Sequence, residues 1–397
     1  MCKKKLLAFL LILFSCFFCS CSTPEESDTS LLLDDKFDTA EFLPEYDFRN
    51  EFGKWRGMCE SEQAYYLFST SNNYLHYYDK ESGISGILCG KPDCDHSDTS
   101  CNAYFIGSGD LMYYDGYIYS VQQGNTLIRI KPDGTERETV QRLQGGIANS
   151  VWLHRGYIYS VQSVSSVVDG VSQNLIRLTQ EVLGDAEQEA KTILEVVGND
   201  YFYQVVENTV YVGIEAYTLA EDSSIASSSI SLYAYDSASG SLDKLAESAV
   251  EDNYLIYDMR YNDDTLYFAG YDITFQNSSL ARYHQDTASI ESVRKMDIPM
   301  MTEIGDHYVL GGNGGTSPSY CIKDFDGNLI REGLLFEDLP ASGNWTFETK
   351  MLAEDQVWIL CNDINPDPAA KQSSRIVKVP LDPAEPVQCI LEIESTL

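Results

Sequence analysis

Short runs of alternating apolar and polar residues repeat along most of the chain, and polar turns with Gly, Asp or Asn separate them. Alternation with a period of two predicts strands that bury one face, and Asp-Gly or Ser-Gly turns between such runs predict hairpins. The clearest runs start about 40 to 56 residues apart. They are Tyr65–Phe68, Tyr117–Tyr119, Tyr157–Tyr159, Thr209–Val212, Thr265–Phe268, His307–Leu310 and Gln356–Leu360.

Each run is followed by a further pair of strands, as in Leu127–Gly134 and Leu232–Gly240, so each repeat unit holds four strands. A four-stranded sheet cannot bury both faces alone, and stacking such sheets around an axis covers both faces of each. We therefore predict an all-β fold, a β-propeller of seven four-stranded blades over residues 51–397. Two packed sandwiches are the alternative, and Glu181–Leu194 has the pattern of a short helix.

The N-terminal residues combine a basic start with an apolar stretch. Lys3–Lys5 precede an apolar run from Leu6 to Phe18, which is shorter than the roughly 20 residues that span a bilayer. This pattern predicts a secretory signal peptide over residues 1–21. A polar stretch follows, and we expect residues 22–50 to form a linker and a lead-in to the propeller.

Cysteines lie at the boundary between the apolar run and this linker. The arrangement resembles the lipobox of bacterial lipoproteins, in which a cysteine takes a diacylglyceryl group and becomes the new N-terminus. The resemblance implies lipid attachment at Cys21, with Cys16 as the alternative residue. It places the protein on a cell membrane, lipid-anchored and facing the extracytoplasmic side. An ordinary cleaved signal peptide with incidental cysteines is the other interpretation.

The charge of the chain excludes one class of partner. The 397 residues include 27 Lys and Arg against 61 Asp and Glu, which gives a net charge of −34. A surface that binds nucleic acid must neutralise phosphates with basic side chains, so we expect no nucleic-acid partner. The same balance argues against a polybasic membrane patch. The 44% of hydrophobic residues is enough for a sizeable core.

One segment concentrates metal-ligating side chains. Cys89, Cys94, His96 and Cys101 lie within 13 residues, and Cys59 lies upstream of them. Three sulfurs and an imidazole could bind a structural zinc ion, although the spacing is not that of a standard zinc motif. Disulfides are permitted outside the cell, so disulfide bonds and free thiols remain the alternatives.

The same segment carries a second resemblance. The string Leu88-Cys89, Pro92-x-Cys94-x-His96, Cys101 and Tyr104 resembles one in uncharacterised bacterial lipoproteins that carry a TolB-like β-propeller. That group has no assigned activity, so the resemblance implies a class of protein and no particular function.

Other candidate residues have structural interpretations. Cys321, Cys361 and Cys389 lie in apolar strand contexts and are expected to be buried free thiols. The four tryptophans, Trp55, Trp152, Trp345 and Trp358, are expected in the core because aromatic residues favour strands.

The sequence thus favours a binding or scaffold module over an enzyme, with an unknown glycan, peptide or protein as its ligand. Inserts at Val164–Gln173 and Thr218–Ser229 are candidate binding loops. Two other hypotheses remain open. One is an extracellular glycan-processing hydrolase or lyase built on a propeller, and the other is a protein-interaction platform of the cell envelope.

Overall fold

We describe the protein from a computed structural model. The structure describes residues 37, 39–52, 57–69, 72–106, 109–168, 171–219, 225–249, 254–272, 277–298, 303–336, 344–364 and 373–394. Residues 40–397 form one compact unit, and of the residues before it only Phe37 and Thr39 are described. The predicted signal peptide, most of the predicted linker and the cysteines Cys16 and Cys21 therefore lie outside the described residues. No helix in the described part of the chain is long and apolar enough to cross a membrane.

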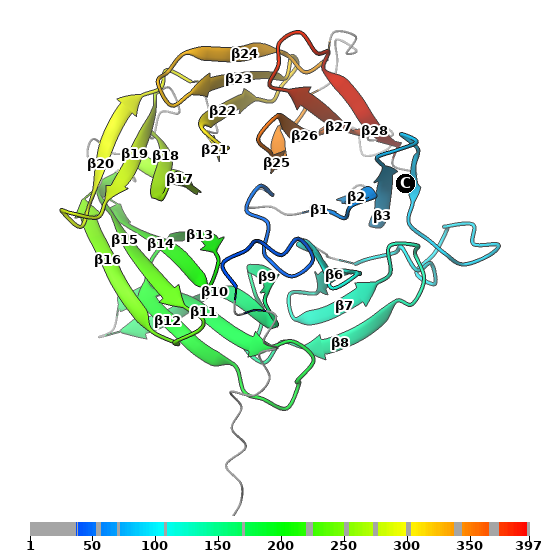
Figure 1. The fold of residues 1–397 in the computed structure, drawn as a ribbon, viewed down its shortest axis with the longest axis horizontal. Coiled ribbons are helices and arrows are strands. Elements are labelled where there is room, and N and C mark those ends of the chain that lie inside the picture. The colour runs from blue at the N-terminus through cyan, green and yellow to red at the C-terminus, as the bar shows by residue number, and fades with distance from the viewer. Residues whose placement is uncertain are drawn as a thin grey trace, which may run out of the picture. The chain divides into compact units, whose positions relative to one another are not determined.

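The compact unit is built from seven four-stranded antiparallel sheets arranged around an axis (Figure 1). The first three blades consist of β1 (Met58–Glu60), β2 (Ala64–Ser69), β3 (Tyr74–Asp79), β4 (Ser85–Ile87); β5 (Leu111–Tyr114), β6 (Tyr117–Gln122), β7 (Thr126–Ile130), β8 (Glu138–Arg142); β9 (Ser150–His154), β10 (Tyr157–Val168), β11 (Val171–Val182) and β12 (Lys191–Val197).

The other four blades follow in chain order. They consist of β13 (Asp200–Val206), β14 (Thr209–Leu219), β15 (Ile225–Asp236), β16 (Leu242–Ala249); β17 (Tyr254–Asn262), β18 (Thr265–Asp272), β19 (Ser278–His284), β20 (Ser289–Lys295); β21 (Glu303–Ile304), β22 (Tyr308–Asn313), β23 (Ser319–Asp324), β24 (Leu329–Leu334); β25 (Glu348–Leu352), β26 (Gln356–Asn362), β27 (Ser373–Pro380) and β28 (Gln388–Glu394).

The predicted all-β propeller with seven four-stranded blades is confirmed. In every blade the first strand is the inner one and the fourth lies at the rim. The helical pattern at Glu181–Leu194 was misleading, because β11 continues to Val182 and β12 begins at Lys191. The pairing of β11 with β12 contains a register shift, so strict alternation is interrupted there. The apolar residues of this irregular hairpin therefore recur with a spacing that resembles that of a helix.

Aromatic side chains fill the space between blades. Trp152 on β9 stacks on Tyr203 of the next blade, with ring centroids 3.9 Å apart and planes within 10°. Trp358 contacts Tyr65 across the junction between the last blade and the first, and their ring centroids are 4.5 Å apart. Both tryptophans are fully buried and Trp345 is also buried, as predicted, whereas Trp55 lies outside the described residues.

The ring closes without sharing a strand between its two ends. All four strands of the first blade and all four of the last come from consecutive segments of the chain. The junction consists of apolar contacts between β1 and β2 on one side and β25 to β28 on the other. Residues 40–52 add no edge strand there, because their one isolated bridge joins Phe52 to Met351 on the inner strand β25.

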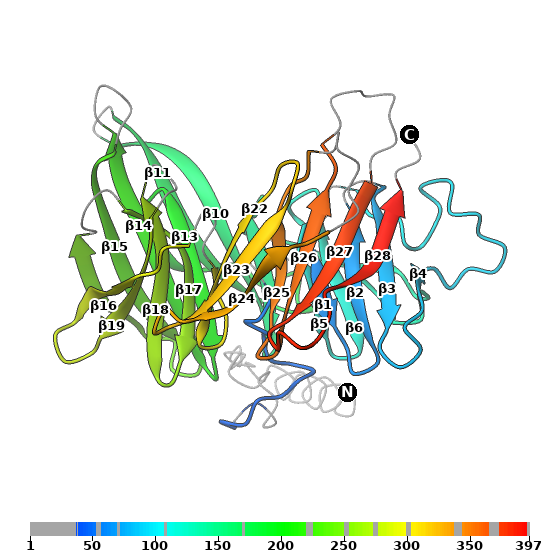
Figure 2. The same cartoon turned by 90° about the horizontal axis from the view of Figure 1, so that it is seen from above.

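The two faces of the ring differ. The inner strands all begin at one face, which we call the hairpin face, and end at the other, which we call the lead-in face. From the hairpin face the β10/β11 pair extends beyond Val161, where the pairing of β10 with β9 ends, and continues to Val168 (Figure 2). At about 3.3 Å per residue this extension spans roughly 20 Å. The predicted insert loops at Val164–Gln173 and Thr218–Ser229 are therefore largely the ends of paired strands.

Candidate functional site

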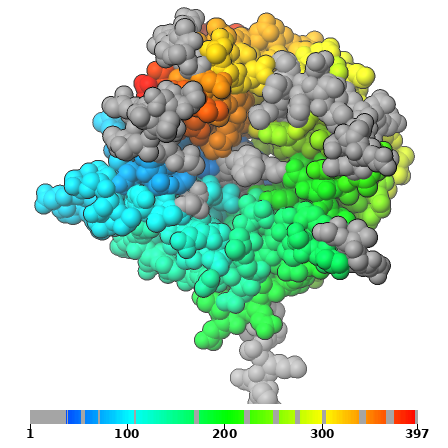
Figure 3. Space-filling view, turned by 180° about the vertical axis from the view of Figure 1, so that it is seen from behind, coloured from blue at the N-terminus to red at the C-terminus, as the bar shows by residue number. Residues whose placement is uncertain are grey.

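The residues between β4 and β5 bring a group of metal-ligating atoms together. One side-chain ligand atom from each of Cys89, Cys94, His96 and Cys101 lies within 4.8 Å of the other three. His96 Nδ1 and Cys101 Sγ are 3.3 Å apart. We call these four residues the Cys/His cluster. Seen from behind, the segment that holds it projects from the rim of the ring (Figure 3, cyan).

Local backbone geometry produces this convergence. Asp93 and His96 both have left-handed backbone conformations, with φ of 60° and 55°. This conformation is uncommon outside glycine but is tolerated best by Asn, Asp and His. The two turns fold the segment back on itself, and the hydroxyl of Tyr74 on β3 donates a hydrogen bond of 2.5 Å to the carbonyl of His96.

The segment is also fastened to the second blade. The backbone N–H of Gly90 and the side-chain amide of Asn102 both donate to the carbonyl of Gly134, each at 2.9 Å. A Cβ atom on Gly134 would lie 2.5 Å from the Gly90 nitrogen, so only glycine permits this approach. The connection between the first two blades is therefore held at several points, although the part of it that the structure describes forms no helix or strand.

The pKa values of two thiols in the cluster, Cys89 and Cys101, shift in opposite directions. Burial opposes ionisation of Cys89, but hydrogen bonds from the N–H groups of Lys91 and Asn102 and from neighbouring thiols outweigh it and lower its pKa. Burial raises the pKa of Cys101 to about 12.

The guanidinium of Arg137 lies 4.9 Å from the ring centre of Phe105 and donates to the Cys101 carbonyl at 3.4 Å.

The remaining cysteines lie elsewhere. Cys59 is buried on inner strand β1 and does not belong to the Cys/His cluster. Cys361 is buried, as expected, and Cys321 is half-buried. The expectation of a buried thiol was wrong for Cys389, which is exposed because it lies on β28, the outermost strand of its blade. None of the seven cysteines in the described residues is joined to another of them by a disulfide bond.

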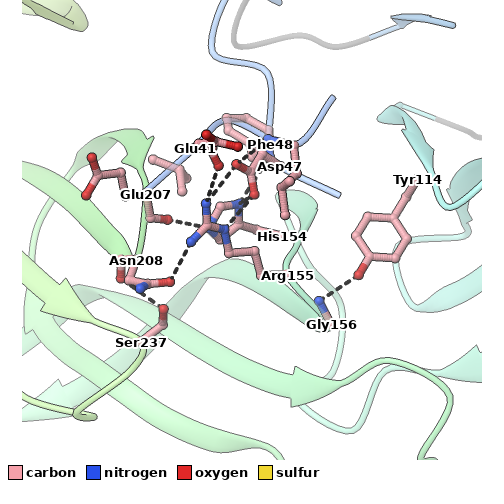
Figure 4. A network of polar contacts seen from close by, with 12 residues as sticks. Glu41, Asp47, Phe48, Tyr114, His154, Arg155, Gly156, Glu207, Asn208 and Ser237 are labelled. Carbon is pink, nitrogen blue, oxygen red and sulfur yellow. Dashed lines mark hydrogen bonds and ion pairs between the residues drawn. The ribbon is translucent and has the colours of Figure 1, made fainter. Parts of the chain in front are cut away.

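The lead-in segment, residues 40–52, docks on the ring through a buried ion pair (Figure 4). Arg155, in the turn after β9, donates to both carboxylate oxygens of Asp47 at 2.7 and 3.0 Å. The same guanidinium donates to the Asn208 side chain in the turn after β13, at 3.0 Å. Asp47 and Arg155 are both buried. One bidentate contact therefore joins the lead-in segment to two adjacent blades.

A buried histidine extends this network. The N–H of Phe48 donates to His154 Nδ1 at 3.1 Å, and His154 Nε2 lies 2.6 Å from the carbonyl of Glu207. Because a carbonyl only accepts, this geometry assigns the proton of a neutral imidazole to Nε2. Burial lowers the pKa of His154 to about 4, which agrees with the neutral form. Sequence reasoning missed this network, since nothing local marks His154 and Arg155 as partners of the lead-in segment.

The lead-in segment then continues along the inner strands. Phe48 packs against Trp152 and Tyr203, and Asn50 exchanges hydrogen bonds with the backbone of Val205. The backbone of Glu51 accepts a hydrogen bond of 2.6 Å from Leu352 on β25. A cavity of about 310 Å³ remains between this segment and the ends of β13 and β17.

Carboxyl groups and tyrosines gather where the inner strands of the later blades begin. Glu303 is the first residue of β21, and Asp258 on the neighbouring β17 accepts a hydrogen bond from the N–H of Ile304 at 2.9 Å. Burial first, and then the charge of Asp258, raise the pKa of Glu303 to about 8. Tyr257 and Tyr271 lie beside them, with ring centroids 5.5 Å apart. We call these four residues the carboxyl–tyrosine group.

The sequence does not select Glu303 and Asp258 as a pair of carboxyl groups that could act in a glycan-processing enzyme. Among 61 acidic residues nothing in the sequence distinguishes Glu303. A carboxyl group whose pKa is raised by burial and by a second carboxyl group nearby is the arrangement from which general acids are built.

Comparisons with known proteins extend only to the fold. No protein-family model matches the chain, and no curated protein matches it in sequence. Among solved structures, a prolyl endopeptidase aligns with a TM-score of 0.51 at 12% identity over 90% of this chain and 51% of that one. The chain thus spans about half the length of that enzyme.

Two further structures are similar to this chain. Oligogalacturonate lyase from Vibrio parahaemolyticus aligns with a TM-score of 0.47 at 9% identity, over 77% of this chain and 89% of that one. YCF48 from Cyanidioschyzon merolae aligns with a TM-score of 0.48 at 9% identity, over 80% of this chain and 96% of that one. At these identities the likeness concerns the fold alone, and the chain is a seven-bladed β-propeller of a family that the comparisons leave open.

Proposed function

We propose that the protein is a binding module tethered by an N-terminal lipid to the outer face of a cell membrane, with its hairpin face turned away from that membrane. The observation that supports this most is the docking of residues 40–52 on the lead-in face. Ala40, to which the N-terminal part of the chain is joined, begins the segment that docks on this face. The projecting β10/β11 and β14/β15 hairpins lie on the opposite face and are free of this segment.

The tether is tested by fractionation of cells that express the full chain. We expect the unsubstituted protein to partition into the detergent phase and its N-terminal peptide to carry acyl groups. Cys21→Ser should release the protein from the membrane fraction, whereas the matched Cys16→Ser variant should remain there. Loss of anchoring in Cys16→Ser alone would move the attachment to Cys16, and anchoring that survives both substitutions would refute the lipid tether.

A second function is favoured by one specific observation, the carboxyl–tyrosine group. Glu303, whose pKa is raised, and the neighbouring carboxyl group of Asp258 could serve as an acid and base pair for cleaving a glycosidic bond. Tyr257 and Tyr271 would then offer flat surfaces on which sugar rings stack. A glycan-processing hydrolase is therefore the alternative to a module that only binds.

One screen separates these two functions. Glycans, peptidoglycan fragments and short peptides are added to the full chain, and a bound ligand raises the melting temperature by mass action. Each glycan that binds is then analysed for cleavage products, with Glu303→Gln as the test variant and the exposed Glu385→Gln as its control. Binding without products supports the module. Products that Glu303→Gln reduces by roughly 100-fold or more support the enzyme.

A further inference from the structure

We propose that Cys89, Cys94, His96 and Cys101 bind one zinc ion that fastens the connection between the first and second blades. The proposal concerns a site at the rim and is independent of the tethered-module function. Its basis is the mutual placement of four ligand atoms, which no other group of cysteine, histidine or acidic side chains in the described residues reproduces.

The distances agree with a tetrahedral site. Zinc binds sulfur at about 2.3 Å and imidazole nitrogen at about 2.0 Å, so neighbouring ligand atoms of a tetrahedron lie about 3.5–3.8 Å apart. The four atoms of the Cys/His cluster lie within 4.8 Å of one another, and His96 Nδ1 lies 3.3 Å from Cys101 Sγ. Each separation between two ligand atoms therefore needs to change by about 1 Å or less for all four to reach one ion.

The composition of the cluster favours a metal over a disulfide. A disulfide would join two of the three sulfurs and leave a thiol and an imidazole beside it with no shared partner. A single zinc ion uses all three sulfurs and the imidazole together. The left-handed backbone of His96, which directs its ring toward Cys101, has a function in a metal site and none in a disulfide.

Neighbouring N–H groups and cationic side chains would stabilise the negative charge of the zinc-bound cluster. Binding of Zn²⁺ replaces the thiol protons of Cys89, Cys94 and Cys101, and three thiolates with one neutral imidazole leave a net charge of −1. N–H groups already point at Cys89 from Lys91 and Asn102. Arg137 donates to the backbone of Cys101, and the ammonium group of Lys91 donates to the carbonyl of Ser100. Two cations therefore lie beside an anionic centre.

Four protein ligands complete the coordination shell, so the ion would be structural and would leave no position for a substrate. Residues 88–110 join β4 to β5, and the described ones, 88–106 and 109–110, form no helix or strand of their own. Long irregular connections need internal contacts to remain ordered. The zinc ion would supply such a contact between the rim of the first blade and the Lys131–Thr135 turn of the second, on which Gly90 and Asn102 are fastened.

The test uses the full chain, purified in mild detergent without added reductant, with Zn²⁺ alone as the added ion. We expect one zinc per chain after dialysis, measured by elemental mass spectrometry. With Co²⁺ in place of zinc, we expect the strong visible absorption of tetrahedral cobalt together with thiolate-to-cobalt charge transfer. Cys94→Ser and His96→Asn should each weaken zinc binding by at least roughly 100-fold, more than the loss of an outer-shell group would.

Matched variants and oxidation control this experiment. The variant His96→Asn keeps a residue that tolerates the left-handed backbone at position 96. Cys321→Ser removes a half-buried thiol outside the cluster, and this variant should still bind one zinc per chain. Three findings would each overturn the proposal. These are a chain without bound zinc whose mass is two hydrogens lower, a cobalt spectrum without charge transfer, and unchanged zinc content in both ligand variants. If the variants fail to fold, the cobalt spectrum of the unsubstituted protein decides.

Discussion

Asp47→Asn should lower the free energy of unfolding by roughly 3 kcal/mol, because it leaves the guanidinium of Arg155 buried without its counter-charge. Asp47 accepts two hydrogen bonds from that guanidinium and a third from the N–H of Leu43 at 3.0 Å. An isosteric amide retains the shape but offers only one acceptor oxygen. Urea unfolding followed by tryptophan fluorescence measures the change, since Trp152 lies under Phe48.

Asp115→Asn is the matched control for this prediction. Asp115 also contacts the lead-in segment, accepting a hydrogen bond of 2.8 Å from the hydroxyl of Tyr46, but it is exposed. Its substitution should cost about 0.5 kcal/mol or less, as is usual at the surface. Limited proteolysis should then cut the lead-in segment faster in Asp47→Asn only. Equal losses of stability in the two variants would show that the buried ion pair does not hold this segment.

Glu303→Gln should stabilise the protein at alkaline pH and leave its stability unchanged in acid. Burial raises the pKa of Glu303 from 4.5 to about 8 in the folded protein. The unfolded chain therefore releases this proton at lower pH than the folded one does. The stability linked to Glu303 is fully present below pH 4.5 and declines as the pH rises to 8. Glutamine resembles the protonated carboxyl and avoids this decline.

The expected gain for Glu303→Gln at pH 8.5 is roughly 3 kcal/mol, below the full value of the shift because the side chain retains some solvent access. Unfolding curves of this variant and the unsubstituted protein should converge near pH 4. Glu385→Gln removes the same charge at an exposed position and serves as the control. If the stability difference from the unsubstituted protein changed with pH in the same way in both variants, a raised pKa of Glu303 would be contradicted.

The fold was predictable because the signals of a propeller are local. Each blade is made of consecutive strands, so alternation in runs such as Tyr157–Tyr159 and the turns beside them reports directly on the sheet. The Cys/His cluster could be selected for a similar reason, since its four residues lie within one connection. Their convergence, however, depends on left-handed turns at Asp93 and His96, which the spacing alone does not reveal.

The contacts of the lead-in segment could not be predicted because they are distant in sequence. Asp47 and Arg155 are 108 residues apart, and Asn50 and Arg260 are 210 apart. Only the curvature of the closed ring brings such residues together. Glu303 was hidden for another reason, since its pKa depends on burial where inner strands begin. The wrong expectation for Cys389 has the same origin, because the sequence shows an apolar strand without showing that it lies at the rim.

The lead-in segment determines where mechanical load enters the protein. Along the chain, a pull on the N-terminal side reaches the contacts of Asp47 and Asn50 with the third, fourth and fifth blades before it reaches β1. The junction between the first and last blades is held by side-chain packing without a shared strand. The ion pair of Asp47 and Arg155 therefore transfers a pulling force on the N-terminal side to the third blade, away from the junction at which the ring closes. The junction between the first and last blades then carries less of that force.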